Sequence, residues 1–100
     1  MALSVVERIR SRLQETLAPS FIDVGDDSAL HAGHAGARSG GGHYRLEIVA
    51  EAFAGKNTVA RHRMIYAALG EMMGGDIHAL AIRARTAAEA ANQPTEKETR

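Results

Sequence analysis

Histidine is the residue type best suited to chemistry in this chain of 100 residues. The sequence holds five histidines, at positions 31, 34, 43, 62 and 78, and no cysteine. Neutral imidazole is a common metal ligand, and the side chain titrates near physiological pH. Without cysteine, the chain can supply neither a thiolate nucleophile nor the sulfur ligands of a zinc ribbon or an all-protein iron-sulfur site. A metal would therefore need imidazoles, carboxylates or ligands from a partner.

Two of the histidines, His31 and His34, form an H-x-x-H pattern inside the glycine-rich segment 25–42. This spacing is shorter than the i, i+4 pair of a zinc-binding helix, and no glutamate lies between the two residues. The segment has little to bury, so we predict a long mobile loop there. The pattern leaves two interpretations open, namely metal ligation and a pair of solvated loop residues.

His43 and His78 fall at the starts of two predicted strands. His43 lies on the polar side of its strand, where structural hydrogen bonding is the more common role. His78 shares a predicted strand face with Leu80 and Ile82, which favours a buried core histidine. It also follows the turn at 74–75, so its ring can reach solvent at the end of the sheet. Spacing alone leaves both roles open.

A local basic cluster precedes and opens the second predicted helix and consists of Lys56, Arg61, His62 and Arg63. Cations near a helix N-terminus oppose the helix dipole, so helix stability does not explain them. Phosphates or the carboxylates of a partner would explain them. The alternative is an ordinary solvated helix face.

Composition limits the remaining function classes. Twelve basic and twelve acidic side chains give a formal net charge of zero, so no global field draws the chain to nucleic acid or anionic lipid. No apolar run approaches the roughly 20 residues of a membrane span, and the first residues are too charged for a signal peptide. Nucleophile-elbow, Walker and paired-carboxylate motifs are absent from the sequence. We expect a cytoplasmic protein that is not an enzyme.

Hydrophobic periodicity places these residues on specific elements. An amphipathic helix is predicted over 4–17, with Ser4 as N-cap and Glu7 completing a capping box. A short strand follows at 21–24 and stops at 25–27. A second, half-buried strand covers 43–50, because its apolar side chains alternate with polar ones. Its inward residues are Tyr44, Leu46 and Ile48.

The second half of the domain adds one helix and one strand. Asn57 or Thr58 caps a helix that runs to about Met73, with an apolar stripe made of Ile65, Ala68, Leu69 and Met72. The segment 77–84 is apolar at nearly every position, which suits the middle strand of a sheet. A last helical turn is predicted over 86–91.

These elements predict an α/β fold in the order α-β-β-α-β, with the long loop between the first two strands. The arrangement is a two-layer sandwich, with the helices packed on one face of a three-stranded sheet. Residues 1–91 form the single domain, and residues 92–100 form a flexible polar tail.

Several short blocks together resemble the BolA family. They are Asp26-Asp27-Ser28, His34, His43-Tyr44, Phe53-Ala54-Gly55, Arg61-His62-Arg63-Met64-Ile65-Tyr66 and Ile77-His78-Ala79-Leu80. The resemblance covers about residues 5–86 and implies a fold like the type II KH domain, although the phosphate-clamping G-x-x-G loop of KH domains is not evident.

The resemblance also implies a function. BolA-like proteins are non-catalytic partners of monothiol glutaredoxins with a CGFS site, and the two proteins share a 2Fe-2S cluster in iron homeostasis and cluster trafficking. The glutaredoxin and its glutathione then supply the thiolates, while the BolA side supplies imidazole. By itself the chain would bind no cluster, and when free it would be a monomer or a weak homodimer.

Carried over by position, the family's expected cluster ligand is His78, and its companion in the loop is His34. His31 competes for that loop role, and His43 is a third candidate. The loop departs from the family pattern at 35–38, where a proline is usual. Some members are described as transcriptional regulators, so DNA binding through the second helix, with its basic cluster, is the alternative function.

Overall fold

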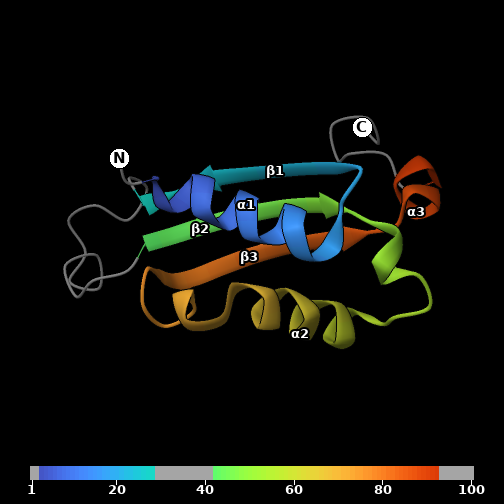
Figure 1. The fold of residues 1–100 in the computed structure, drawn as a ribbon. Coiled ribbons are helices and arrows are strands. Elements are labelled where there is room, and N and C mark those ends of the chain that lie inside the picture. The colour runs from blue at the N-terminus through green and yellow to red at the C-terminus, as the bar shows by residue number, and fades with distance from the viewer. Residues whose placement is uncertain (1–2, 29–41, 93–100) are drawn as a thin grey trace.

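The structure is a computed structural model that describes residues 3–28 and 42–92. Its helices and strands follow the predicted order, and the helical turn predicted over 86–91 is present as a short final helix (Figure 1). In chain order they are α1 (Val5–Leu17), β1 (Phe21–Asp26), β2 (Gly42–Val49), the 3-10 turn η3 (Glu51–Phe53), α2 (Thr58–Leu69), the 3-10 turn η4 (Gly70–Met72), β3 (Ile77–Arg85) and α3 (Ala87–Asn92). Most of the predicted loop and tail, residues 29–41 and 93–100, lies outside the described residues.

Both long helices pack on the same face of the sheet. Ile9 and Leu13 of α1 and Ile65 and Leu69 of α2 are all fully buried in one core cluster. The sheet contributes the three inward side chains expected from the alternation in β2, which are Tyr44, Leu46 and Ile48. The predicted two-layer sandwich is therefore confirmed, and within residues 3–28 and 42–92 no long helix packs on the opposite face of the sheet.

The strand order is β1-β2-β3, with β1 antiparallel and β3 parallel to the central β2. The prediction that 77–84 forms the middle strand is wrong, because β3 lies at an edge. Its apolar run reflects two different surfaces. Leu80 and Ile82 pack against the core, whereas the exposed Ala81 is small enough to face solvent at little cost.

A register shift interrupts the β2–β3 ladder at its first step. Gly42 is opposite Ile77, but His43 is opposite Ala79, so His78 is an extra residue on β3. Such an insertion is a β-bulge, which breaks the alternation of side chains. Ile77 is fully buried and His78 is exposed. The expectation that His78 shares the core face with Leu80 and Ile82 is therefore wrong.

Local signals define the helix ends as predicted at α1 and differently at α2. The capping box is present: the Glu7 N–H donates to the Ser4 hydroxyl at 3.1 Å, and the Ser4 N–H donates to the Glu7 carboxylate at 3.1 Å. Asn57 caps α2 by accepting a bond from the Ala60 N–H at 2.8 Å. The helix ends at Leu69, four residues earlier than predicted, because φ is +57° at the following Gly70 and glycine tolerates that conformation.

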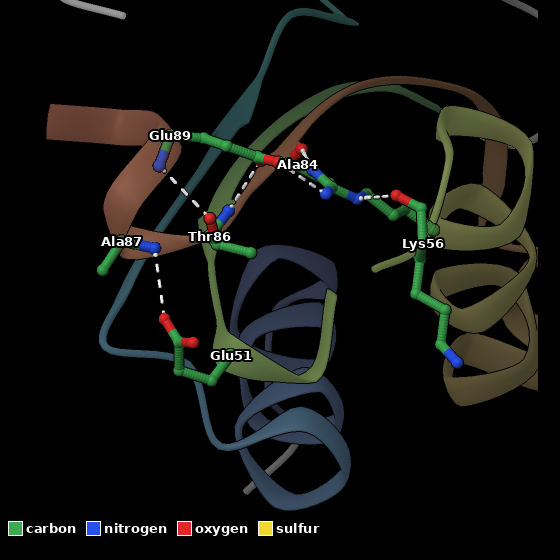
Figure 2. A network of polar contacts seen from close by, with 7 residues as sticks. Glu51, Lys56, Ala84, Thr86, Ala87 and Glu89 are labelled. Carbon is green, nitrogen blue, oxygen red and sulfur yellow. Dashed lines mark hydrogen bonds and ion pairs between the residues drawn. The ribbon is translucent and has the colours of Figure 1, made fainter. Parts of the chain in front are cut away.

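Arg61 is a buried structural residue that joins α2, β3 and α3. Its guanidinium donates two bonds to the Glu89 carboxylate at 2.6 and 2.8 Å, one to the Ala84 carbonyl at 3.0 Å and one to the Lys56 carbonyl at 2.8 Å (Figure 2). It also lies 5.8 Å from the Phe53 ring centroid. At 9% exposure, Arg61 does not belong to an exposed basic cluster, which corrects the sequence expectation.

The partner of Arg61 also holds the start of α3. The Thr86 N–H donates to the Glu89 carboxylate at 3.0 Å, and the Glu89 N–H donates to the Thr86 hydroxyl at 3.2 Å. This is a second capping box. The Arg61 guanidinium, followed by the Thr86 N–H, lowers the pKa of Glu89 from its ordinary 4.5 to about 2. The same pair raises the pKa of Arg61.

Replacing Glu89 by glutamine should lower the free energy of unfolding at about pH 7 and reduce its dependence on acid. The folded-state pKa of Glu89 lies below its ordinary value, so the stabilisation is present above about pH 4.5 and is lost as the pH falls toward 2. Urea unfolding followed by far-UV circular dichroism measures both effects.

The control for this test is Glu15→Gln, which changes an exposed carboxylate on α1. Its unfolding midpoint should follow the wild type across the same pH range. Wild-type and Glu89→Gln midpoints that fall in parallel between about pH 5 and pH 3 would contradict the assigned pair.

Candidate functional site

His43 and His78 meet at the end of the sheet where β2 and β3 begin. The two strands are parallel, so their first residues lie at the same end of the sheet. The ring centroids are 5.2 Å apart and the rings are tilted by 51°. His78 is exposed and His43 is half-buried. The structure thus brings together two of the four predicted metal ligands.

The main chain of His43 is held from the β1 side. Its N–H donates to the Ser28 hydroxyl at 3.1 Å, and its carbonyl accepts from the Asp27 N–H at 2.8 Å. Asp27 also forms an ion pair with Arg45, the next outward residue on β2. The position of the His43 backbone therefore depends on Asp27 and Ser28, the last described residues before position 29.

The turn that leads into His78 is held from α1 and β2. The Gly42 N–H donates to the Asp76 carbonyl at 2.9 Å, and the Asp76 carboxylate pairs with Arg8 of α1 at 2.9 Å. The Gly74 N–H donates to the Ile77 carbonyl at 2.9 Å and closes the turn. Both histidines therefore project from fixed backbone.

Buried and hydrogen-bonded groups beside the pair have shifted pKa values. Burial, followed by the charges of Asp26 and Asp76, raises the pKa of the Tyr44 phenol. Hydrogen bonds from the Ser28 N–H and side chain lower the pKa of Asp26. Tyr44 is therefore neutral and Asp26 is ionised at neutral pH, so neither group titrates where imidazole does.

A shallow cavity of about 290 Å³ lies next to the histidine pair and is lined by Asp27, His43, Tyr44, Ala79, Leu80 and Ala81. A second cavity of about 230 Å³ shares Ala81 and extends toward Glu47 and Arg83. The small side chains of Ala79 and Ala81 leave this space open. A partner that approaches the imidazoles therefore has room along β2 and β3.

The other two predicted metal ligands lie in a part of the chain that the structure does not describe. His31 and His34 fall in residues 29–41, outside the described part, so their ligation stays a prediction. Within residues 3–28 and 42–92, no group of three or more histidine, cysteine, aspartate or glutamate side chains is arranged to hold a metal ion. The described pair thus offers two imidazoles and does not form a complete metal site by itself.

The predicted basic cluster becomes a mixed surface on α2. Lys56 and Arg63 are exposed and His62 is half-buried, whereas Arg61 points into the domain. His62 packs edge-to-face with Tyr66, with ring centroids 6.3 Å apart. We call Val59, His62, Arg63 and Tyr66 the α2 outer face.

The sequence analysis did not identify four residues that belong to the α2 outer face or hold the His43–His78 pair. Val59 and Tyr66 are exposed by 57% and 41%, and their helical spacing from His62 and Arg63 was the available signal. Ser28 and Asp76 position the histidines. The Asp26-x-Ser28 spacing, typical of a side-chain-to-backbone turn, pointed to the first of them. For Asp76 the sequence carried no local signal.

Within residues 3–28 and 42–92, every helix is too short or too polar to span a membrane. The predicted cytoplasmic location stays a prediction, because relatives from Arabidopsis thaliana carry names that place them in the chloroplast or the mitochondrion.

Comparison with known proteins gives consistent matches. The chain is 41% identical over 81 residues to human BolA-like protein 1, covering 81% of this chain and 57% of that protein. It is 36% identical over 87 residues to the DNA-binding transcriptional regulator BolA of Escherichia coli, covering 87% and 80%. It is 45% identical over 87 residues to SufE-like protein 1 of Arabidopsis thaliana, covering 82% of this chain and 24% of that protein.

The solved BolA domain of the Arabidopsis SufE1 protein superposes with a TM-score of 0.76 at 44% identity and covers 88% of this chain and 99% of that domain. This chain thus spans little more than half of human BolA-like protein 1 and a quarter of SufE-like protein 1. The names of these relatives indicate BolA-like or regulatory proteins and no catalytic family. A family-wide comparison matches residues 13–89 to the BolA family, described as BolA-like protein, and this chain therefore belongs to that family.

Proposed function

We propose that this chain is a non-catalytic binding module that pairs with a monothiol CGFS glutaredoxin and helps to ligate a shared 2Fe-2S cluster. Its role would lie in iron homeostasis or cluster trafficking. The observation that supports this most directly is the His43–His78 pair, with ring centroids 5.2 Å apart at an accessible end of the sheet.

The donor chemistry of the chain fits such a cluster. Imidazole nitrogens replace two thiolates on one iron in Rieske-type centres, and this raises the reduction potential. The chain has no cysteine, so the thiolates would come from the glutaredoxin and its glutathione. His78 would be one ligand, and His43, His34 or His31 would be the second.

The residues around the pair would give the partner a defined place to bind. The bulge at His78 exposes that imidazole, and hydrogen bonds with Asp27, Ser28 and Asp76 fix the backbone at the start of β2. The cavity lined by His43 and the second cavity beyond Ala81 leave space for partner side chains along β2 and β3. These contacts would orient the imidazoles and exclude water, while the chemistry of the cluster belongs to the complex.

Replacing His78 by alanine should change the visible absorption and circular dichroism of the complex and shorten the lifetime of the cluster. We expect a loss rate at least about tenfold higher, since losing even an outer-shell partner of a metal site has effects of that order. The measurement is anaerobic co-purification with a CGFS glutaredoxin, followed by visible spectroscopy over time.

Two further variants complete this test. Glu15→Gln changes an exposed side chain on α1 and should leave the spectrum unchanged. His43→Ala should reproduce the His78 effect if His43 is the second ligand, and should have little effect if a histidine at 31 or 34 takes that role. An unchanged spectrum and lifetime in His78→Ala would remove His78 from the site.

A second candidate function is DNA binding through α2. It is favoured by the name of the Escherichia coli relative and by the accessible cations on and before α2. Arg61 takes no part in it, because its guanidinium is bonded within the domain. Lys56 and Arg63 would contact phosphates, and with zero net charge the binding would depend on these local contacts.

For this candidate, Arg63→Ala should weaken binding to a promoter duplex and lower the slope of log affinity against log salt concentration by about 0.9. Fluorescence anisotropy at several salt concentrations measures that slope. His78→Ala is the matched control, because it should alter the cluster spectrum and leave DNA binding unchanged. Equal affinity for promoter and random duplexes would contradict a specific regulator.

A further inference from the structure

Ser28 lies where β1 ends and where the start of β2 passes beside it. Its N–H donates to the Asp26 carboxylate at 2.9 Å, which fixes the backbone turn after β1. Its hydroxyl oxygen accepts the N–H of His43 at 3.1 Å. One small side chain therefore connects the end of the first strand to the backbone of a candidate ligand.

The Ser28 hydroxyl is enclosed by two other groups. A Cβ atom placed on Gly42 would lie 2.7 Å from the Ser28 hydroxyl oxygen and 2.7 Å from the Tyr44 hydroxyl oxygen. Only glycine allows this approach, since real Cβ atoms do not pack so closely. Ser28, Gly42 and Tyr44 thus form one packed unit.

This packed unit is bonded to His43, where the register between β2 and β3 changes. His43 is the first residue of β2 after the shift, and its ring lies 5.2 Å from that of the bulged His78. Both backbone polar atoms of His43 are bonded to the 27–28 segment. Removing the Ser28 hydroxyl would take away one of these two bonds and loosen the hold of the 27–28 segment on the start of β2.

We propose that Ser28 is a positioning residue whose hydroxyl holds the His43 backbone and thereby sets the spacing of the His43–His78 pair. The expected effect of Ser28 on cluster lifetime rests on the proposed function. Its expected effect on the spacing of the imidazoles does not, because that spacing is a property of the free protein.

The first test uses the free protein and three variants. Ser28→Ala removes the hydroxyl, Ser28→Thr keeps it, and Ser20→Ala removes a serine hydroxyl that bonds the Val49 carbonyl at the opposite end of the same strand pair. Two-dimensional NMR of the imidazole carbons should show shifted His43 and His78 signals in Ser28→Ala. Wild-type signals are expected in Ser28→Thr and Ser20→Ala.

The second test measures cluster lifetime in the complex with a CGFS glutaredoxin. Ser28→Ala should lose the cluster about fivefold faster than wild type, the factor expected for one net hydrogen bond. Ser28→Thr should restore the wild-type rate, and Ser20→Ala should not change it. A merely structural role would lower the urea midpoint in both alanine variants and leave the imidazole signals and cluster lifetime unchanged.

The two tests separate the failure of this inference from that of the proposed function. If wild type carries no cluster, the proposed function fails, and the imidazole signals alone decide the role of Ser28. If wild type carries a cluster and Ser28→Ala keeps both the signals and the lifetime, the inference is wrong. Should Ser28→Ala fail to fold, Gly42→Ala perturbs the same unit from the other side, and unchanged imidazole signals there overturn the inference.

Discussion

The parallel pairing of β2 with β3 determines where the candidate site can be. Two parallel strands begin at the same end of a sheet. Their first residues are therefore neighbours even though 35 positions separate His43 from His78 in the sequence. The bulge then turns this proximity into a usable site, since it releases His78 from the core face. An antiparallel pairing of the same strands would place the two imidazoles at opposite ends.

Parallel pairing requires a crossover, and here α2 provides it. Arg61 fastens the start of that crossover to the end of β3, with four hydrogen bonds to Lys56, Ala84 and Glu89. A buried guanidinium is tolerated only with such complete bonding. A residue that the sequence placed in a partner-binding basic cluster thus serves the topology instead, and the exposed cations of that cluster are Lys56 and Arg63.

Features that depend on nearby residues were predictable from the sequence. The Ser4 and Glu7 capping box, the inward face of β2 and the apolar stripe of α2 all follow from spacings of two to four residues. Features set by distant partners were not. Glu89 is 28 positions from Arg61, and the exposure of His78 depends on its register with β2. The alternation inside one strand carries no information about that register.

Under the proposed function, the chemistry of the cluster would be divided between this chain and its partner. A cysteine-free domain can hold imidazoles on strands but cannot complete a cluster with thiolates. Rigid strands fix where the two side chains leave the backbone, and the side-chain rotamers then set the distance between the ring nitrogens. In such a complex this fold would contribute imidazole donors, and the affinity would depend on how closely the partner's sulfur ligands match their spacing.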